Sequence, residues 1–179
     1  MKTFIGIDLG STTTKAVVID EARNVLGRGI TNSRSNYDTA ATVAKQEALV
    51  AARFHLFRNA LSKSNALNGE LEDFIVQLER DFRLEQYLQQ LADLEGVCRR
   101  NVETAKFGDA AGGVAVALER LFSLLKAEAP QLFLPGAKRK SDFFRDIAGA
   151  QYLAQGEQVA KDAGVRYDHF KTTFDDRRT

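Results

Sequence analysis

The stretch Ile5–Val17, which reads IGIDLGSTTTKAV, decides how the amino-terminal part of this chain folds. Its apolar residues alternate with small or polar ones as far as Leu9, which is the pattern of a β-strand. Gly10 then permits a tight turn. The apolar run Ala16–Ile19 is short enough for a second strand that is buried on both faces. The stretch therefore predicts a β-hairpin made of strands at residues 3–9 and 13–20.

A third strand is predicted at Val25–Thr31, because the polar segment Asp20–Asn24 has the composition of a turn. Three antiparallel strands joined by tight turns are the simplest arrangement of residues 1–35. Leucine, alanine, glutamate and glutamine dominate the rest of the chain. We therefore predict an α/β protein with a three-stranded sheet, a mainly helical region at 36–164, and the start of a following segment at 165–179.

Helical spacing of apolar residues begins after Asn36 and predicts several long helices. Further helices are predicted over Leu71–Cys98, over Ala110–Ala129 and from a cap at Ser141 to about Gly164. Since three strands cannot bury both faces of a sheet, either the helices form their own bundle or more sheet lies outside this chain. The first helix is expected to bury one face through Val43, Val50, Phe54, Phe57 and Leu61.

Charge and composition exclude several classes of protein. The chain has 179 residues, of which 44% are hydrophobic, and its 25 Lys+Arg against 24 Asp+Glu give a formal net charge of +1. A protein that coats nucleic acid or an acidic membrane surface is therefore disfavoured. No run approaches the roughly 20 apolar residues of a membrane span. Asp8 interrupts the segment that would form the core of a signal peptide, so we expect a cytoplasmic protein.

The hairpin turn has the residue types of a phosphate site. Backbone N–H groups around Gly10 and the hydroxyls of Ser11, Thr12 and Thr13 can hydrogen-bond an anion, and Lys15 can neutralise its charge. Asp8 suits a hydrated Mg²⁺ ion, which binds through one or two carboxylates and keeps several waters. The stretch is not a P-loop, because a strand follows the turn. From residue types alone, a hairpin whose polar residues merely make the turn is an equal alternative.

In its order of residues the stretch resembles the first phosphate-binding hairpin of the superfamily of actin, sugar kinases and heat-shock chaperone ATPases. Within that superfamily it looks most like the ATPase subunits that activate 2-hydroxyacyl-CoA dehydratases and ATP-dependent benzoyl-CoA reductases. Residues 35–40 and 136–144 are similar to the helical region of the larger ATPase subunit of benzoyl-CoA reductase. The resemblance implies an actin-like (ribonuclease H-like) ATPase domain that binds ATP and Mg²⁺.

The resemblance also implies roles for individual residues. Asp8 would organise Mg²⁺ through water, and Lys15 would assist at the phosphates. The family holds an iron-sulfur cluster between two subunits through a pair of cysteines on each, but this chain has only Cys98, which we interpret as a buried apolar residue. No second phosphate hairpin, adenosine motif or catalytic residue is located. We therefore expect a truncated amino-terminal portion, inactive as this chain alone. The phosphates would be surrounded by Gly10, Ser11, Thr12 and Thr13.

The function implied is that of an ATP-binding subunit in a benzoyl-CoA-reductase-like complex, where ATP hydrolysis drives a low-potential electron to an aromatic acyl-CoA. Its partners would be a second ATPase subunit, the catalytic reductase subunits and ferredoxin as electron donor, with no nucleic acid and no membrane. Two alternatives stay open. One is a fragment of a sugar-kinase or chaperone-like ATPase, and the other is a non-enzymatic helical interaction module.

Overall fold

The computed structural model divides the chain into two compact units, Met1–Glu79 and Arg80–Thr179. The predicted boundaries after residues 35 and 164, which separate the strands, the helical region and a following segment, follow sequence motifs and stay a prediction. The structure describes residues 1–33, 36–64, 67, 69–104, 107–138 and 143–174.

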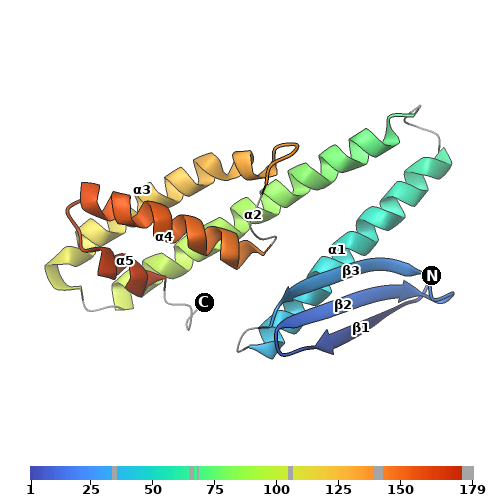
Figure 1. The fold of residues 1–179 in the computed structure, drawn as a ribbon, viewed down its shortest axis with the longest axis horizontal. Helices are drawn as coiled ribbons and strands as arrows, with labels where there is room; N and C mark the ends of the chain where they lie inside the picture. The colour runs from blue at the N-terminus through green and yellow to red at the C-terminus, as the bar shows by residue number, and fades with distance from the viewer. Residues whose placement is uncertain (34–35, 65–66, 68, 105–106, 139–142, 175–179) are drawn as a thin grey trace. The chain divides into compact units, whose positions relative to one another are not determined.

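The first unit contains the predicted three-stranded sheet. Strands β1 (Thr3–Leu9), β2 (Thr13–Asp20) and β3 (Val25–Asn32) pair antiparallel in the order β1-β2-β3 (Figure 1). The turn between β2 and β3 closes on Asp20, whose carboxylate accepts hydrogen bonds from the Asn24 backbone N–H at 2.8 Å and from its side-chain amide at 2.9 Å. These bonds to the ionised form lower the pKa of Asp20. The predicted sheet is confirmed.

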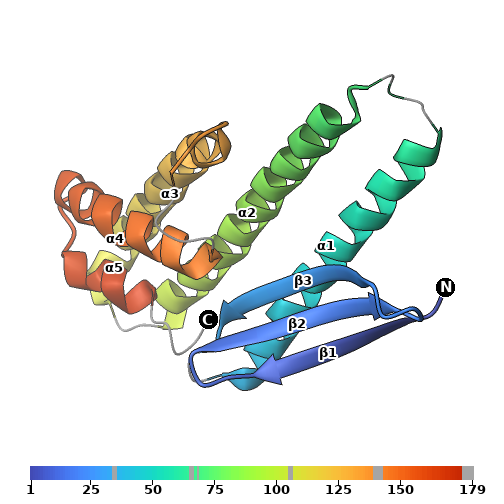
Figure 2. The same ribbon diagram turned by 45° about the vertical axis from the view of Figure 1, so that its right-hand side comes forward.

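Helix α1 (Tyr37–Ser64) packs on one face of this sheet (Figure 2). The Asn36 side chain caps the helix, because its Oδ1 accepts the Thr39 backbone N–H at 2.9 Å. The predicted helix is confirmed, but the face predicted to be buried is wrong. Phe57 is 41% exposed, and Val43, Val50, Phe54 and Leu61 are only partly buried. The buried face of α1 consists of Ala40, Ala44, Ala48 and Ala52.

Glycines in β3 explain why α1 buries alanines. A Cβ atom on Gly27 would lie 2.3 Å from the Ala48 carbonyl oxygen, and one on Gly29 would lie 2.1 Å from the Ala44 carbonyl oxygen. The helix backbone therefore approaches the strand so closely that larger side chains do not fit between them.

Strand β2 is covered on one face only, which corrects the prediction of burial on both faces. Ala16 and Val18 are 4% and 1% exposed, whereas Val17 and Ile19 on the other face are only partly buried. Helix α1 covers Ala16 and Val18. Antiparallel pairing puts Ile7 opposite Ala16 and therefore on the α1 side of the sheet, yet Ile7 remains 41% exposed.

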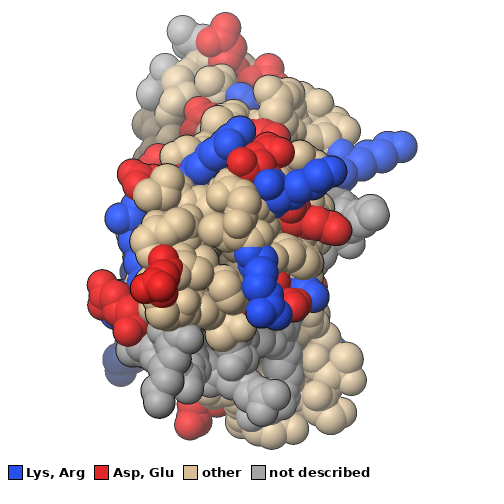
Figure 3. All heavy atoms as spheres, turned by 90° about the vertical axis from the view of Figure 1, so that its left-hand side faces the viewer, with Lys and Arg blue, Asp and Glu red and all other residues tan. Residues whose placement is uncertain are grey.

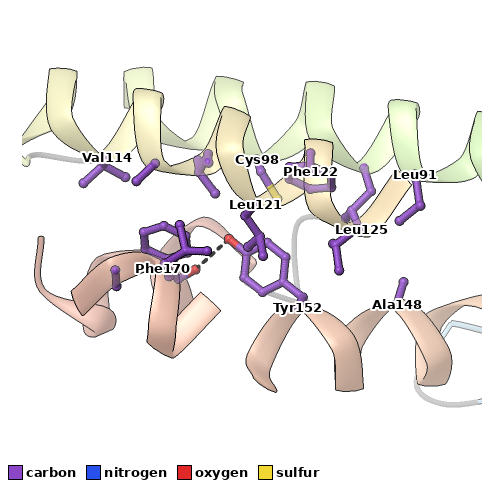
Figure 4. Close-up of a cluster of buried hydrophobic side chains, with 14 of the residues drawn as sticks. Leu91, Cys98, Val114, Leu121, Phe122, Leu125, Ala148, Tyr152 and Phe170 are labelled. Carbon is purple, nitrogen blue, oxygen red and sulfur yellow. Dashed lines mark hydrogen bonds between the residues drawn. The ribbon is translucent and has the colours of Figure 1, made fainter. Parts of the chain in front are cut away.

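The second unit is helical and has its own core. Tyr152, Phe122 and Phe170 are fully buried there, together with Leu121 and Cys98 (Figure 4). The Tyr152 hydroxyl lies 2.7 Å from the Thr173 hydroxyl and donates to the Phe170 carbonyl at 3.2 Å. The helices of this unit thus form a bundle of their own, as one of the two alternatives held, whereas α1 packs on the sheet. Its elements are the later part of α2 (Leu71–Thr104), η1 (Gly108–Ala110), α3 (Ala111–Glu128), η2 (Ala129–Phe133), α4 (Phe144–Asp162) and α5 (Tyr167–Thr173).

Several predicted helix ends are confirmed. Pro130 lies in η2 directly after α3, and Gly164 follows α4 with a φ of +66°, the left-handed conformation that favours glycine after a helix. The predicted cap at Ser141 lies outside the described residues. Over the part of the chain that the structure describes, no helix combines the length and apolarity that a membrane crossing needs.

Candidate functional site

The hairpin between β1 and β2 lies where three strand ends meet. Because β1 and β3 run in the same direction and β2 runs against both, the end of β1, the start of β2 and the end of β3 share one end of the sheet (Figures 1 and 2). The turn at Gly10–Thr12 connects the first two. All of the predicted site residues therefore fall on one short stretch at this end.

The strand register places Asp8 and Lys15 on one face. Their Cα atoms are partners across the β1–β2 ladder, so both side chains leave the sheet on the same side. That side is opposite α1, because the neighbouring residue Ala16 is the one buried against the helix. Asp8 and Lys15 are both exposed. The side of the sheet that carries the carboxylate is therefore open.

A buried serine supports the turn from β3. Ser33 is 1% exposed, and its hydroxyl donates to the Gly10 carbonyl at 2.5 Å. Since this bond uses its only proton, the buried Thr14 hydroxyl 2.9 Å away is the donor to Ser33 Oγ. The Ser33 backbone N–H donates to the Thr12 carbonyl at 3.0 Å. Three hydrogen bonds thus tie one residue to the hairpin.

Gly10 is required by the shape of the turn. A Cβ atom at this position would lie 2.6 Å from the Thr13 carbonyl oxygen, closer than real Cβ contacts. The turn therefore brings its own backbone close together at Gly10. Ser11 and Thr12 are exposed on it, and Thr13 is half-buried.

These residues fit a phosphate with a hydrated Mg²⁺ ion. The turn offers hydroxyls and backbone N–H groups to an anion, Lys15 supplies a positive charge, and Asp8 is an exposed carboxylate on the same face. Among the described residues no group of three or more His, Cys, Asp or Glu side chains is placed to hold a metal ion. A cation at Asp8 would therefore keep most of its water, as Mg²⁺ does.

An iron-sulfur cluster does not fit the cysteine of this chain. Cys98 is 0% exposed in the core of the helical unit, as interpreted from its place among leucines. Desolvation raises the pKa of its thiol to about 12, so the thiolate needed to bind iron is strongly disfavoured. The Cys98 side chain packs as a small apolar group.

On one face of the described part of the chain, the charged side chains do not gather into a patch of one sign. On the face drawn in Figure 3, Lys and Arg side chains are interspersed with Asp and Glu. Elsewhere among the described residues, Glu95 pairs with Lys126 at 2.6 Å and with Arg99 at 2.7 Å. Mixed charge of this kind is typical of a solvated surface rather than of an anion site.

Sequence reasoning missed Ser33 and the inward role of Thr14. The register signal misleads by one residue, because the β2–β3 register shifts between Val18 and Ile19 and a count outward from the turn at Asp20–Asn24 puts Thr31 opposite Thr13. The structure instead pairs Asn32 with Thr13. The next residue, Ser33, then reaches Thr12 and the turn. Counting from the turn would not have found it, because that count puts Asn32 rather than Ser33 opposite Thr12.

Comparison with known proteins gives a family match. A model of the BadF/BadG/BcrA/BcrD ATPase family matches residues 5–132, which include most of β1, the turn, all of β2, Ser33 and helix α1. No curated protein and no solved structure shows significant similarity to the chain.

Proposed function

Because this chain belongs to the BadF/BadG/BcrA/BcrD ATPase family, we propose that the turn between β1 and β2 binds the phosphates of Mg·ATP. The observation that carries the proposal is the position of Asp8 and Lys15 as cross-strand partners on the open face of the sheet, beside a turn that only glycine can make. Family membership alone would not say which residues of this chain touch the nucleotide.

Each residue of the site has a distinct task in this proposal. Exposed hydroxyls of Ser11 and Thr12 and backbone N–H groups of the turn donate hydrogen bonds to phosphate oxygens. Lys15 offsets their negative charge. Asp8 accepts hydrogen bonds from the water shell of Mg²⁺ and so fixes the cation next to the phosphates. ATP supplies the phosphoryl group, and transfer depends mainly on positioning and charge stabilisation.

We further propose that the protein acts as an ATP-binding subunit of a benzoyl-CoA-reductase-like complex in the cytoplasm. There it would couple ATP hydrolysis to low-potential electron transfer, with a second ATPase subunit, catalytic reductase subunits and ferredoxin as partners. The family match supports the ATPase part of this role. The cluster ligands would come from cysteines other than Cys98, because that thiol is buried.

A titration of the 179-residue chain with Mg·ATP, followed by ¹⁵N NMR, tests the site. A single hairpin without further nucleotide contacts should bind weakly, with a Kd on the order of 1 mM. We expect Asp8→Asn to weaken binding about tenfold, because it removes the charge next to the cation. Asp73→Asn is the matched control, since it removes an exposed carboxylate from α2 and should bind like the wild type.

Two results would contradict the proposal. If the wild type shows no saturable shift with Mg·ATP, the hairpin is no nucleotide site and a helical interaction module becomes the better description. If Asp8→Asn and Asp73→Asn bind equally well, the nucleotide sits elsewhere in the chain.

A further inference from the structure

We propose that Ser33 is a positioning residue that shapes the turn for phosphate binding before the nucleotide arrives. This inference rests on the proposed function of the hairpin. Ser33 lies just past the end of β3, yet its hydroxyl and its backbone N–H both bond to the turn between β1 and β2. Within the described part of the chain its hydrogen bonds reach neither Asp8 nor Lys15, so it acts through the backbone of the turn.

The geometry of the peptide bond connects Ser33 to the N–H groups of the turn. Among the described residues every peptide bond is trans, so the C=O and the N–H of one planar unit point in opposite directions. The Gly10 carbonyl points at the Ser33 hydroxyl, and the Ser11 N–H of the same unit therefore points away from Ser33. The Thr12 carbonyl points at the Ser33 backbone N–H, which turns the Thr13 N–H away as well.

This arrangement favours an anion for electrostatic reasons. A carbonyl oxygen facing a phosphate would repel it, whereas an N–H group facing it donates a hydrogen bond. Ser33 occupies two carbonyl oxygens of the turn on the β3 side, so neither is left to face the ligand. The turn thus needs no rearrangement on binding, which preserves affinity.

Burial makes this support stiff. Ser33 and Thr14 are 1% and 0% exposed, so water does not compete for their hydroxyls. Thr14 donates to Ser33 Oγ at 2.9 Å and thereby directs the single Ser33 proton toward Gly10. Removing the Ser33 hydroxyl would leave the Gly10 carbonyl without that donor. The carbonyl could then turn toward solvent or toward the phosphate.

The test compares Ser33→Ala with the wild type in the Mg·ATP titration. We expect about tenfold weaker binding, and altered amide shifts of Ser11 and Thr13 already in the free protein. Thr173→Val is the matched control, because it removes a fully buried hydroxyl that bonds Tyr152 in the helical unit. It should lower thermal stability and leave both the affinity and the Ser11 and Thr13 shifts unchanged.

Thr14→Val replaces Ser33→Ala in this test if circular dichroism shows that Ser33→Ala does not fold. Valine keeps the shape of threonine and removes only the hydroxyl that donates to Ser33. It should also weaken Mg·ATP binding and move the Ser11 and Thr13 amides. Wild-type affinity in Ser33→Ala, or in Thr14→Val, overturns the role of Ser33 and leaves the hairpin proposal intact. Absence of binding by the wild type overturns both.

Discussion

At the scale of single residues, the shape of the site depends on residues that would not themselves contact the nucleotide through a side chain. Gly10 contributes the absence of a Cβ atom, and Ser33 contributes one buried proton. Asp8 and Lys15, by comparison, are exposed and can meet a charged ligand directly. The buried Ser33 holds the short turn in a defined shape, and the exposed Asp8 and Lys15 remain available to a ligand.

Glu95 gives a prediction about pH at the same scale. Burial raises the pKa of this carboxyl, but hydrogen bonds from Lys126 and Arg99 outweigh burial and the net pKa is lowered. Because the pKa of Glu95 is lower in the folded protein than in the unfolded chain, its ion pairs stabilise the fold fully above the ordinary carboxyl pKa of about 4.3. This stabilisation is lost as the pH falls through the pKa of the folded protein.

We expect Glu95→Gln to lower the free energy of unfolding by about 1 kcal/mol at pH 7, with the loss shrinking as the pH falls through the lowered pKa of Glu95. Urea unfolding of both proteins at a series of pH values measures this difference. Glu119→Gln is a suitable control, because that carboxylate is 66% exposed and lies 3.9 Å from Arg99. A Glu95→Gln effect that is independent of pH would contradict this account.

At the scale of elements, the contact between α1 and β3 decides how the first unit packs. Gly29→Ala would put a Cβ atom 2.1 Å from the Ala44 carbonyl and 2.6 Å from the Ala48 nitrogen, so the helix must move away from the sheet. We expect a loss of about 3 kcal/mol in the free energy of unfolding, or failure of this unit to fold.

Gly96→Ala is the matched substitution in α2, where a Cβ atom would meet only the end of the Arg100 side chain at 3.5 Å. Alanine favours a helix over glycine, so stability should rise by up to about 1 kcal/mol. Thermal unfolding of the two variants compares them directly. If Gly29→Ala is as stable as the wild type, the close contact between α1 and the sheet is wrong.

The same contact shows where sequence reasoning succeeds and fails. Strand periods and turn residues were sufficient for β1, β2 and β3, because each signal is local. The buried face of α1 could not be read in this way, since large apolar residues such as Phe54 and Phe57 outweigh alanines in any pattern. Only the position of Gly27 and Gly29 under the helix makes the alanine face the one that fits.

At the scale of the whole molecule, the two units have hydrophobic cores of different composition. The sheet unit has a small core of alanines, Val18 and Leu26, whereas the helical unit buries large side chains such as Phe122 and Tyr152. The candidate site belongs to the sheet unit. Its residues were predictable because they are contiguous in sequence, and Ser33 was missed because it is brought to the turn by pairing through two hairpins.

Mn²⁺·ATP in place of Mg²⁺·ATP tests the central claim most directly, because the paramagnetic ion broadens NMR signals of nearby amides. We expect saturable broadening centred on the amides of residues 8–14, with Asp8→Asn removing most of it and Asp73→Asn removing none. Mn²⁺ without nucleotide provides the baseline for general binding to carboxylates. Broadening that is no stronger at residues 8–14 than at other exposed carboxylates would contradict the assignment of the hairpin as the nucleotide site.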